Sequence, residues 1–300
     1  MRTTALTTAS LLASLITFAL PEAMAQPTTT LDKVRASGSF TVAYRESSIP
    51  FSYLDEKAQP TGFGWEICGR IVDQVKKATG RKDLKVQTQA VTSANRIPLL
   101  QNGTIDIECG STTNNSDRQK QVAFATNYFY TGTRFLVKAG TPVKSLDDLK
   151  GKTVVSTTGT TNFRVIRNLN EEKKLGIELA GAKDHAESAL LVQTGRALAF
   201  AMDDILLYGL KASAGNPAEF EVVGEAIQVE PYAIMLRKDD PAFKKLVDDT
   251  IAELIRSGEF NRLYTKWFQS PIPPKGINLN APMSKELQDN LKNLSDKPAT

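Results

Sequence analysis

Strand-like and helix-like segments alternate along almost the whole chain, and this alternation constrains the fold more than any other feature of the sequence. In residues 64–79, Ile67, Ile71 and Val75 recur every four positions, which predicts a helix that ends at Gly80. Strands that alternate with helices are typical of α/β folds, in which helices cover a sheet. We therefore predict an α/β protein.

The predicted elements form two successive series. The first has strands at 39–44, 84–90 and 105–109, and helices at 64–79, 94–102 and from Ser116, where Gln119 would complete a capping box. The second has strands at 134–138, 152–156 and 197–202, and helices from Ser145, at 160–173 and at 185–193. The chain closes with a strand at 232–236 and helices at 241–257, 259–268 and 284–294. This order indicates two lobes, with the chain crossing between them more than once.

The N-terminus has the features of a secretory signal peptide. Arg2 supplies a positive charge, residues 11–20 form an apolar run, and small residues up to Ala25 offer a cleavage site. The run is too short to span a bilayer as a helix. We predict that residues 1–25 are a signal peptide, cleaved after Ala25, and that the mature protein is periplasmic.

Composition argues against several classes of function. Basic and acidic residues are nearly balanced, 37 against 33, and are dispersed along the chain, so we predict no nucleic-acid partner. His185 is the only histidine and no Cys/His cluster occurs, so we predict no metal site and no cofactor. Phosphate-binding and hydrolase motifs are missing, which weakens an enzymatic interpretation.

The two cysteines leave one structural question open. Cys68 falls within a predicted helix and Cys109 at the end of a predicted strand. In an oxidising compartment the two side chains could form a disulfide, but two buried free thiols fit the pattern equally well.

Polar, hydroxyl-rich segments follow the predicted strands. They are residues 45–50, 92–96, 110–115, 157–161, 183–185 and 203–204. Open α/β sheets bind ligands where strands end and helices begin, and helix N-termini favour carboxylates or phosphates. A serine or threonine at such a position is often only a helix cap. Six polar loops in the same topological position favour a shared binding site.

These segments resemble the glutamate/aspartate-binding proteins of bacterial ABC transporters, a group within solute-binding protein family 3. The matching stretches are RESSIPFSY (45–53), SANRIPLLQNGTIDIECGSTTNNSDRQKQ (93–121), TGTTNF (158–163), AKDHAES (182–188), AFAMDDILL (199–207), MLRKDDPAFKKLVDDTIAELIRSGE (235–259) and KWFQSPIPPK (266–275). The resemblance covers nearly the whole mature chain. Ile234 stands where some relatives have a cysteine, which puts a disulfide between Cys109 and that strand in doubt.

The resemblance implies a type II periplasmic binding protein fold. Residues 31–128 plus 231–300 would form one lobe and residues 129–230 the other, joined by two hinge strands with the ligand held between the lobes. A closed complex would deliver L-glutamate or L-aspartate to the permease of an inner-membrane ABC transporter, and the protein would act as a monomer without enzymatic activity.

The resemblance also implies a ligand-binding set. Arg118 would bind the α-carboxylate, Asp203 with Ser111 and Thr113 the α-ammonium, and Arg45, Ser93, Arg96 and His185 the side-chain carboxylate, with Thr160 and Thr161 as donors from the second lobe. This charge pattern suits a zwitterion that carries an extra carboxylate, because a guanidinium binds carboxylates bidentately and stays charged.

The sequence leaves three alternatives open. The ligand could be either acidic amino acid, because one methylene changes affinity by only about 1–3 kcal/mol. The protein could feed a sensory receptor instead of a transporter. It could also be an enzyme of the same fold, such as a dehydratase, with Glu46 or Asp203 as its acid or base.

Overall fold

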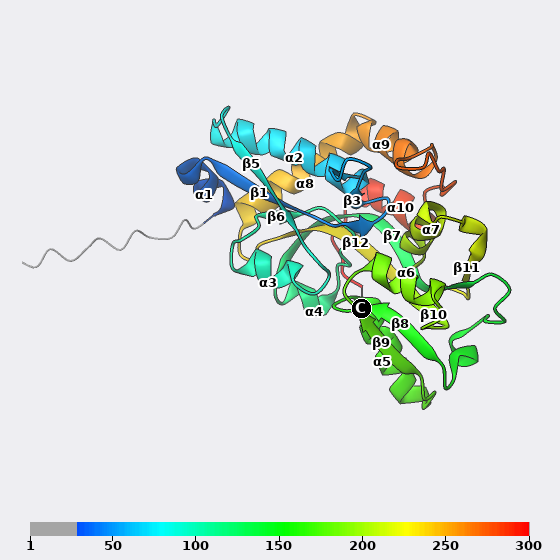
Figure 1. Cartoon of the computed structure of the whole chain (residues 1–300). Helices are drawn as coiled ribbons and strands as arrows, with labels where there is room; N and C mark the ends of the chain where they lie inside the picture. The colour runs from blue at the N-terminus through cyan, green and yellow to red at the C-terminus, as the bar shows by residue number, and fades with distance from the viewer. Residues whose placement is uncertain (1–28, 300) are drawn as a thin grey trace, which may run out of the picture.

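The computed structural model describes residues 29–299 (Figure 1). The predicted signal peptide and its cleavage site lie outside the described residues. Within residues 29–299, no helix combines the length and apolar character that crossing a membrane requires.

Helices and strands alternate as predicted. The strands are β1 (Ser39–Tyr44), β2 (Ser47–Ser48), β3 (Ser52–Leu54), β4 (Pro60–Thr61), β5 (Lys85–Ala90), β6 (Ile107–Glu108), β7 (Ala123–Lys138), β8 (Thr153–Thr157), β9 (Glu178–Ala182), β10 (Ala199–Asp203), β11 (Phe220–Val223) and β12 (Val229–Leu236). The α-helices are α1 (Thr30–Ser37), α2 (Phe63–Thr79), α3 (Arg96–Gln101), α4 (Ser116–Gln119), α5 (Thr161–Lys173), α6 (His185–Gln193), α7 (Asp204–Ser213), α8 (Pro241–Arg256), α9 (Glu259–Phe268) and α10 (Lys285–Asn293). Short 3-10 helices cover Leu146–Leu149 and Pro217–Glu219.

One mixed sheet organises the fold. Its order is β5-β1-β6-β12-β7-β10-β8-β9, and β11 pairs with β7 off this path. β5, β1 and β6 run parallel, and so do β10, β8 and β9. Between these two groups, β12 and β7 pair antiparallel with each other and with their outer neighbours. The sheet thus consists of two parallel halves connected by two antiparallel strands.

β7 runs through both halves of the sheet (Figure 1). Residues 123–132 pair with β12, and residues 133–137 pair with β10. The sequence predicted a strand only at 134–138. Polar residues such as Thr126, Asn127 and Thr131 interrupt the apolar pattern before it, yet the fold buries them. A strand buried on both faces shows no clean alternation, which explains why its first part was missed.

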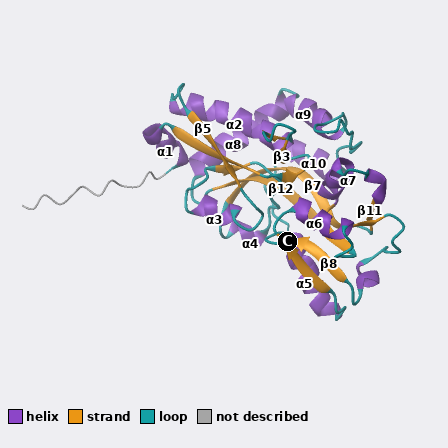
Figure 2. Cartoon of the chain, viewed as in Figure 1, coloured by secondary structure: helices purple, strands orange, loops and turns teal. Residues whose placement is uncertain are grey.

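Helices cover both faces of the sheet (Figure 2). In the first half, the aromatic rings of Phe51, Phe129 and Phe268 pack closely, with 4.9 Å between the centroids of Phe51 and Phe129 and again of Phe129 and Phe268. Burying an aromatic side chain stabilises a fold by about 1.5–3 kcal/mol. This contact joins β7 to α9, so the C-terminal helices pack with the first half although they follow the second half in sequence.

A disulfide between Cys68 and Cys109 links α2 to the end of β6, with 5.9 Å between the two Cα atoms. Of the two alternatives that the sequence left open, the disulfide is the one present in the structure. Cys109 directly precedes the polar loop 110–115, so the disulfide anchors the start of that loop.

α4 begins at Ser116, as predicted, but its cap differs from the sequence prediction. Asn115 caps α4, because its extended backbone lets the side-chain oxygen accept a hydrogen bond from the Arg118 amide at 2.9 Å. The predicted capping box at Ser116 is therefore wrong by one residue. Asp204 is the first residue of α7, and its carboxylate accepts a hydrogen bond from the Thr131 hydroxyl at 2.6 Å.

Candidate functional site

The residues predicted to bind ligand come together between the two sheet halves. All ten side chains are buried, none more than 8% exposed. Nine of them line one narrow cavity, which is too tight in this structure to hold a water molecule: Ser93, Arg96, Ser111, Thr113, Arg118, Thr160, Thr161, His185 and Asp203. Arg45, the tenth, adjoins this group through contacts with Ser93 and His185. Asn162 and Met202, which the sequence did not single out, also line the cavity.

Both halves of the sheet contribute to the cavity because their parallel strands end beside it. Arg96 begins α3 and Arg118 lies in α4, both in the first half, whereas Thr161 begins α5 and His185 begins α6 in the second. The first turn of a helix carries amide groups without intrahelical acceptors and a positive dipole end. The arrangement therefore adds backbone donors to the charged side chains.

Arg45 and His185 form one end of the site. The Nη2 atom of Arg45 donates to the Ser93 hydroxyl at 2.9 Å and lies 3.4 Å from Nε2 of His185. Since a guanidinium can only donate, Nε2 of His185 must be the acceptor, and Nδ1 then carries the proton toward the Thr157 hydroxyl at 2.9 Å. Burial, with the nearby positive charges of Arg45 and Arg96, lowers the pKa of His185 well below its ordinary value, so the imidazole is neutral.

Arg96 lies beside a buried acid that the sequence analysis missed. Its Nη1 atom donates to the Thr112 hydroxyl at 2.5 Å and is 4.0 Å from the carboxylate of Glu108. The Thr112 hydroxyl in turn donates to Glu108. Glu108 is fully buried in β6, and an acid between Ile107 and Cys109 was the signal that could have revealed it.

Arg118 connects the two halves of the molecule. Its Nη1 atom donates to the carbonyl of Thr113 at 2.9 Å, and its Nη2 atom donates to the carbonyl of Gly159 at 3.1 Å, in the loop before α5. Gly159 has a φ of +83°, and a Cβ atom there would come within 2.5 Å of the Ala94 backbone, so only glycine allows this close approach. Burial and the charge of Arg96 lower the pKa of Arg118 to about 9, which keeps it protonated at neutral pH.

Asp203 is the acidic member of the site. One carboxylate oxygen accepts from the Tyr232 hydroxyl, and the other accepts from the Asn162 amide at 2.7 Å. Burial and the charge of Glu230 raise the pKa of Asp203 well above its ordinary value. Tyr232 and Asn162 were predicted only as parts of a strand and a helix, and Glu230 lies outside every predicted element.

The hydroxyl groups of Thr160 and Thr161 are already committed to protein partners. The hydroxyl of Thr160 donates to the Thr157 carbonyl at 2.7 Å and accepts from the Phe163 amide at 3.1 Å, as a helix cap does. The hydroxyl of Thr161 donates to Glu230. Any donors that these two residues offer to the cavity are therefore backbone amides of the first turn of α5.

Several buried polar atoms of the site have no hydrogen-bond partner within the described chain. They include the donors Nη1 of Arg45 and Nε of Arg96, the Oδ1 acceptor of Asn162 and the hydroxyl of Ser111. Buried polar atoms normally have partners. Unsatisfied donors on two arginines and an unsatisfied acceptor on Asn162 suit a small ligand that carries both negative and positive charge. Across residues 29–299, no cluster of histidine, cysteine and acidic side chains could hold a metal ion.

A model of the bacterial extracellular solute-binding proteins, family 3, matches residues 40–270. The chain belongs to this family. An L-glutamate/L-aspartate-binding protein of Pseudomonas aeruginosa is 49% identical over 294 residues, which cover 97% of each chain. A glutamate/aspartate import solute-binding protein of Salmonella typhimurium is 50% identical over 268 residues, 89% of each chain.

Solved structures of other solute-binding proteins show the same fold. A mutant of ArgBP from T. maritima superposes with a TM-score of 0.72 at 25% identity, over 80% of this chain and 99% of that chain. An ancestral arginine-binding protein bound to glutamine gives a TM-score of 0.69 at 27% identity, over 77% and 98% of the two chains. The predicted α/β periplasmic binding protein fold is therefore confirmed. The relatives are solute-binding proteins rather than enzymes.

Proposed function

We propose that this solute-binding protein captures L-glutamate or L-aspartate between its two lobes and presents it to the permease of an ABC transporter. The observation that carries this proposal is the charge pattern of the site. Two buried guanidinium groups, those of Arg96 and Arg118, line a cavity that the carboxylate of Asp203 also lines, and the buried guanidinium of Arg45 adjoins it. The names of the two most similar relatives described above support the same ligand class.

Each charged group of an acidic amino acid has a complement in the site. Arg118 would hold the α-carboxylate, joined by the amides at the start of α5. Asp203, Ser111 and Thr113 would accept from the α-ammonium. Arg45 and Arg96, with Ser93 and His185, would bind the side-chain carboxylate. A carboxylate at this last position would supply an acceptor for the unsatisfied nitrogen atoms of Arg45 and Arg96.

The same groups would exclude neutral amino acids. A ligand without a second carboxylate leaves Arg45, 2% exposed, without a hydrogen-bonded anion inside the closed site, and leaves Arg96 with only the carboxylate of Glu108, 4.0 Å away. Removing one partner of a buried ion pair typically costs about 3–5 kcal/mol, and an unmatched guanidinium here is a comparable case. Discrimination against glutamine and asparagine should therefore be strong.

Binding would proceed by closure of two lobes, residues 31–128 plus 231–300 and residues 129–230, about β7 and β12. Contacts between the two sides support this division, because Arg118 reaches Gly159 and the Thr113 hydroxyl lies 3.2 Å from that of Thr161. A ligand that both lobes contact would stabilise the closed form, which the transporter then recognises.

The cellular setting is part of the same proposal. Residues 1–25 would direct export to the periplasm and be cleaved after Ala25. A monomer would suffice, since one chain supplies all ten site residues. The protein would have no enzymatic activity, because Asp203 is held by two hydrogen bonds in a position suited to an ammonium group.

Isothermal titration calorimetry tests the proposal. The protein is unfolded and refolded to remove carried-over ligand, then titrated with L-glutamate, L-aspartate, L-glutamine and L-asparagine. We expect tight binding of both acids and weak or undetectable binding of both amides. Comparable affinity for an acid and its amide would refute the assignment of Arg45, Arg96 and His185. Turnover of a cyclic acid would favour the dehydratase alternative.

A further inference from the structure

Glu230 is a buried carboxylate on β12 that the proposed ligand-binding set does not use. Its side chain is fully buried. Its Oε2 atom accepts hydrogen bonds from the hydroxyls of Thr113 and Thr161, and its Oε1 atom accepts from the side-chain amide of Gln228. Thr113 follows β6 in the first half and Thr161 begins α5 in the second. One carboxylate on a connecting strand therefore holds a hydroxyl from each half.

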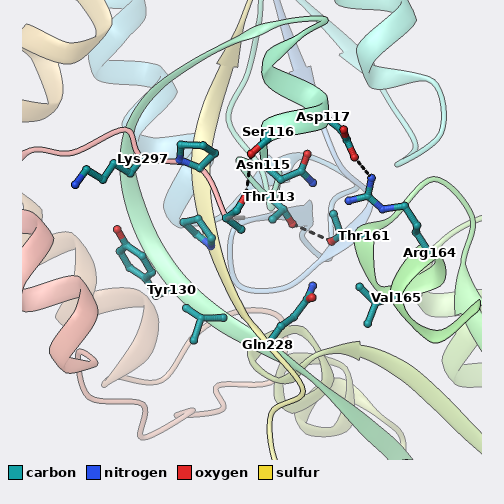
Figure 3. A pocket seen from close by; sticks show the side chains of 14 residues that line it. Thr113, Asn115, Ser116, Asp117, Tyr130, Thr161, Arg164, Val165, Gln228 and Lys297 are labelled. Carbon is teal, nitrogen blue, oxygen red and sulfur yellow. Dashed lines mark hydrogen bonds and ion pairs between the residues drawn. The ribbon is translucent and has the colours of Figure 1, made fainter. Parts of the chain in front are cut away.

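The two threonines stand between the enclosed cavity and the surface. Both line the ligand cavity, and both also line a separate open cleft of about 600 Å³. Figure 3 shows their hydroxyl contact beside that cleft, near the ion pair between Asp117 and Arg164. Their side chains form part of the wall of the cavity, so the orientation of each hydroxyl determines whether the ligand meets a donor or an acceptor there.

Counting protons shows which orientation Glu230 imposes. A threonine hydroxyl has one proton to donate and two lone pairs that accept, whereas an ionised carboxylate only accepts. Thr113 and Thr161 each direct their single proton at Glu230. Neither hydroxyl then has a proton for the cavity, and each presents lone pairs to it.

We propose that Glu230 is a specificity-determining residue that acts through Thr113, fixing this hydroxyl as an acceptor for the ligand's ammonium group. The inference rests on the proposed function, since it assumes an amino-acid ligand in this cavity. An ammonium group brings three N–H donors and needs acceptors around it. Asp203 provides a carboxylate and Asn162 an unsatisfied Oδ1 atom, and both residues line the same cavity as Thr113. A threonine that donated its proton inward would oppose an ammonium group there.

The test compares L-glutamate with glutarate, which has the same two carboxylates and no amino group. The affinities of wild type and Glu230→Gln for both ligands are measured by calorimetry. If glutarate binds weakly, its affinity is determined by displacement. The glutamine amide can donate to one threonine, which frees that hydroxyl proton to point into the cavity. We expect the preference for glutamate over glutarate to fall about tenfold or more, because a hydrogen bond to a charged group is lost. The affinity for glutarate should change by less than about threefold.

Asp248→Asn is the matched control. Asp248 also accepts a hydrogen bond from a threonine hydroxyl, that of Thr126 at 3.1 Å, but it lies on α8 away from the cavity. This variant should keep the wild-type preference for glutamate over glutarate. If Glu230→Gln does not fold, Thr113→Val serves instead. This variant should likewise lower the affinity for glutamate far more than the affinity for glutarate.

The outcomes separate this inference from the proposed function. A selective loss of glutamate affinity supports the role of Glu230. Equal losses for both ligands would assign Glu230 a purely structural role and overturn the inference, and so would unchanged affinities for both. If wild type binds neither L-glutamate nor L-aspartate, the proposed function fails and the inference fails with it.

Discussion

Replacing Arg45 with methionine should weaken binding of acidic ligands and make closure of the ligand-free protein easier. The side chain is 2% exposed, and only one of its terminal nitrogen atoms, Nη2, has partners in the described chain. Methionine has a similar length, carries no charge and adapts to irregular space. The substitution therefore removes the charge while keeping most of the volume.

The structure gives the size of both effects. Burial, with the charge of Arg96, lowers the pKa of Arg45 from its ordinary value to about 9. Because a tenfold change in an equilibrium corresponds to about 1.4 kcal/mol, the protonated guanidinium costs about 5 kcal/mol in the closed site. A ligand carboxylate would offset this cost, and methionine would remove it. Losing a charge-assisted hydrogen bond costs about 1.5–3 kcal/mol, so glutamate affinity should fall about ten- to hundredfold.

Two measurements check this prediction. Calorimetry gives the affinity for L-glutamate, and small-angle X-ray scattering of the ligand-free protein reports how far the lobes have closed. We expect a smaller radius of gyration for ligand-free Arg45→Met than for ligand-free wild type. Arg167→Met, at an exposed position on α5, is the control and should match wild type in both measurements. Affinity within about threefold of wild type would refute the reasoning, and so would a ligand-free variant as open as wild type.

Three further predictions test other parts of the site. Arg118→Ala should abolish measurable glutamate binding while leaving far-UV circular dichroism unchanged, because the guanidinium contacts only loop carbonyls; unchanged affinity would remove Arg118 from the binding set. The lowered pKa of His185 means that the unfolded chain binds a proton before the folded protein does as the pH falls. His185 should therefore lower the stability of the ligand-free protein as the pH falls below about 6.5, and thermal melts should show a smaller drop in His185→Gln; equal drops would exclude His185 as the cause. Replacing Cys68 and Cys109 by alanine opens a link between residues 41 positions apart, which should lower the free energy of unfolding by up to about 4 kcal/mol in denaturant titrations. Glutamate affinity should stay within about threefold, because neither sulfur lines the cavity, and a large loss of affinity would contradict that placement.

The local sequence pattern predicted helices correctly where one periodicity dominates a segment. The helices at 185–193 and 259–268 have the bounds that the sequence predicted. Apolar spacing and flanking glycines are properties of the chain itself, so no tertiary contact is needed to recognise them. β9 at Glu178–Ala182 was not predicted, because its side chains, of which only that of Ala182 is fully buried, show no apolar alternation and its pairing with β8 comes from a distant segment.

The sequence by itself determined the α/β alternation, the six polar loops after strands and, through the quoted motifs, the ten residues now found together. Only the tertiary structure decided the disulfide between Cys68 and Cys109, since both a disulfide and free thiols fit the same pattern. It also decided the places of Glu108, which shares its predicted strand with Asp106, and of Glu230, which lies outside every predicted element. Their partners, Arg96 and Thr161, lie 12 and 69 residues away along the chain and come near only after folding. The acceptor to which each hydroxyl donates its proton depends on such partners, and the local sequence does not reveal them.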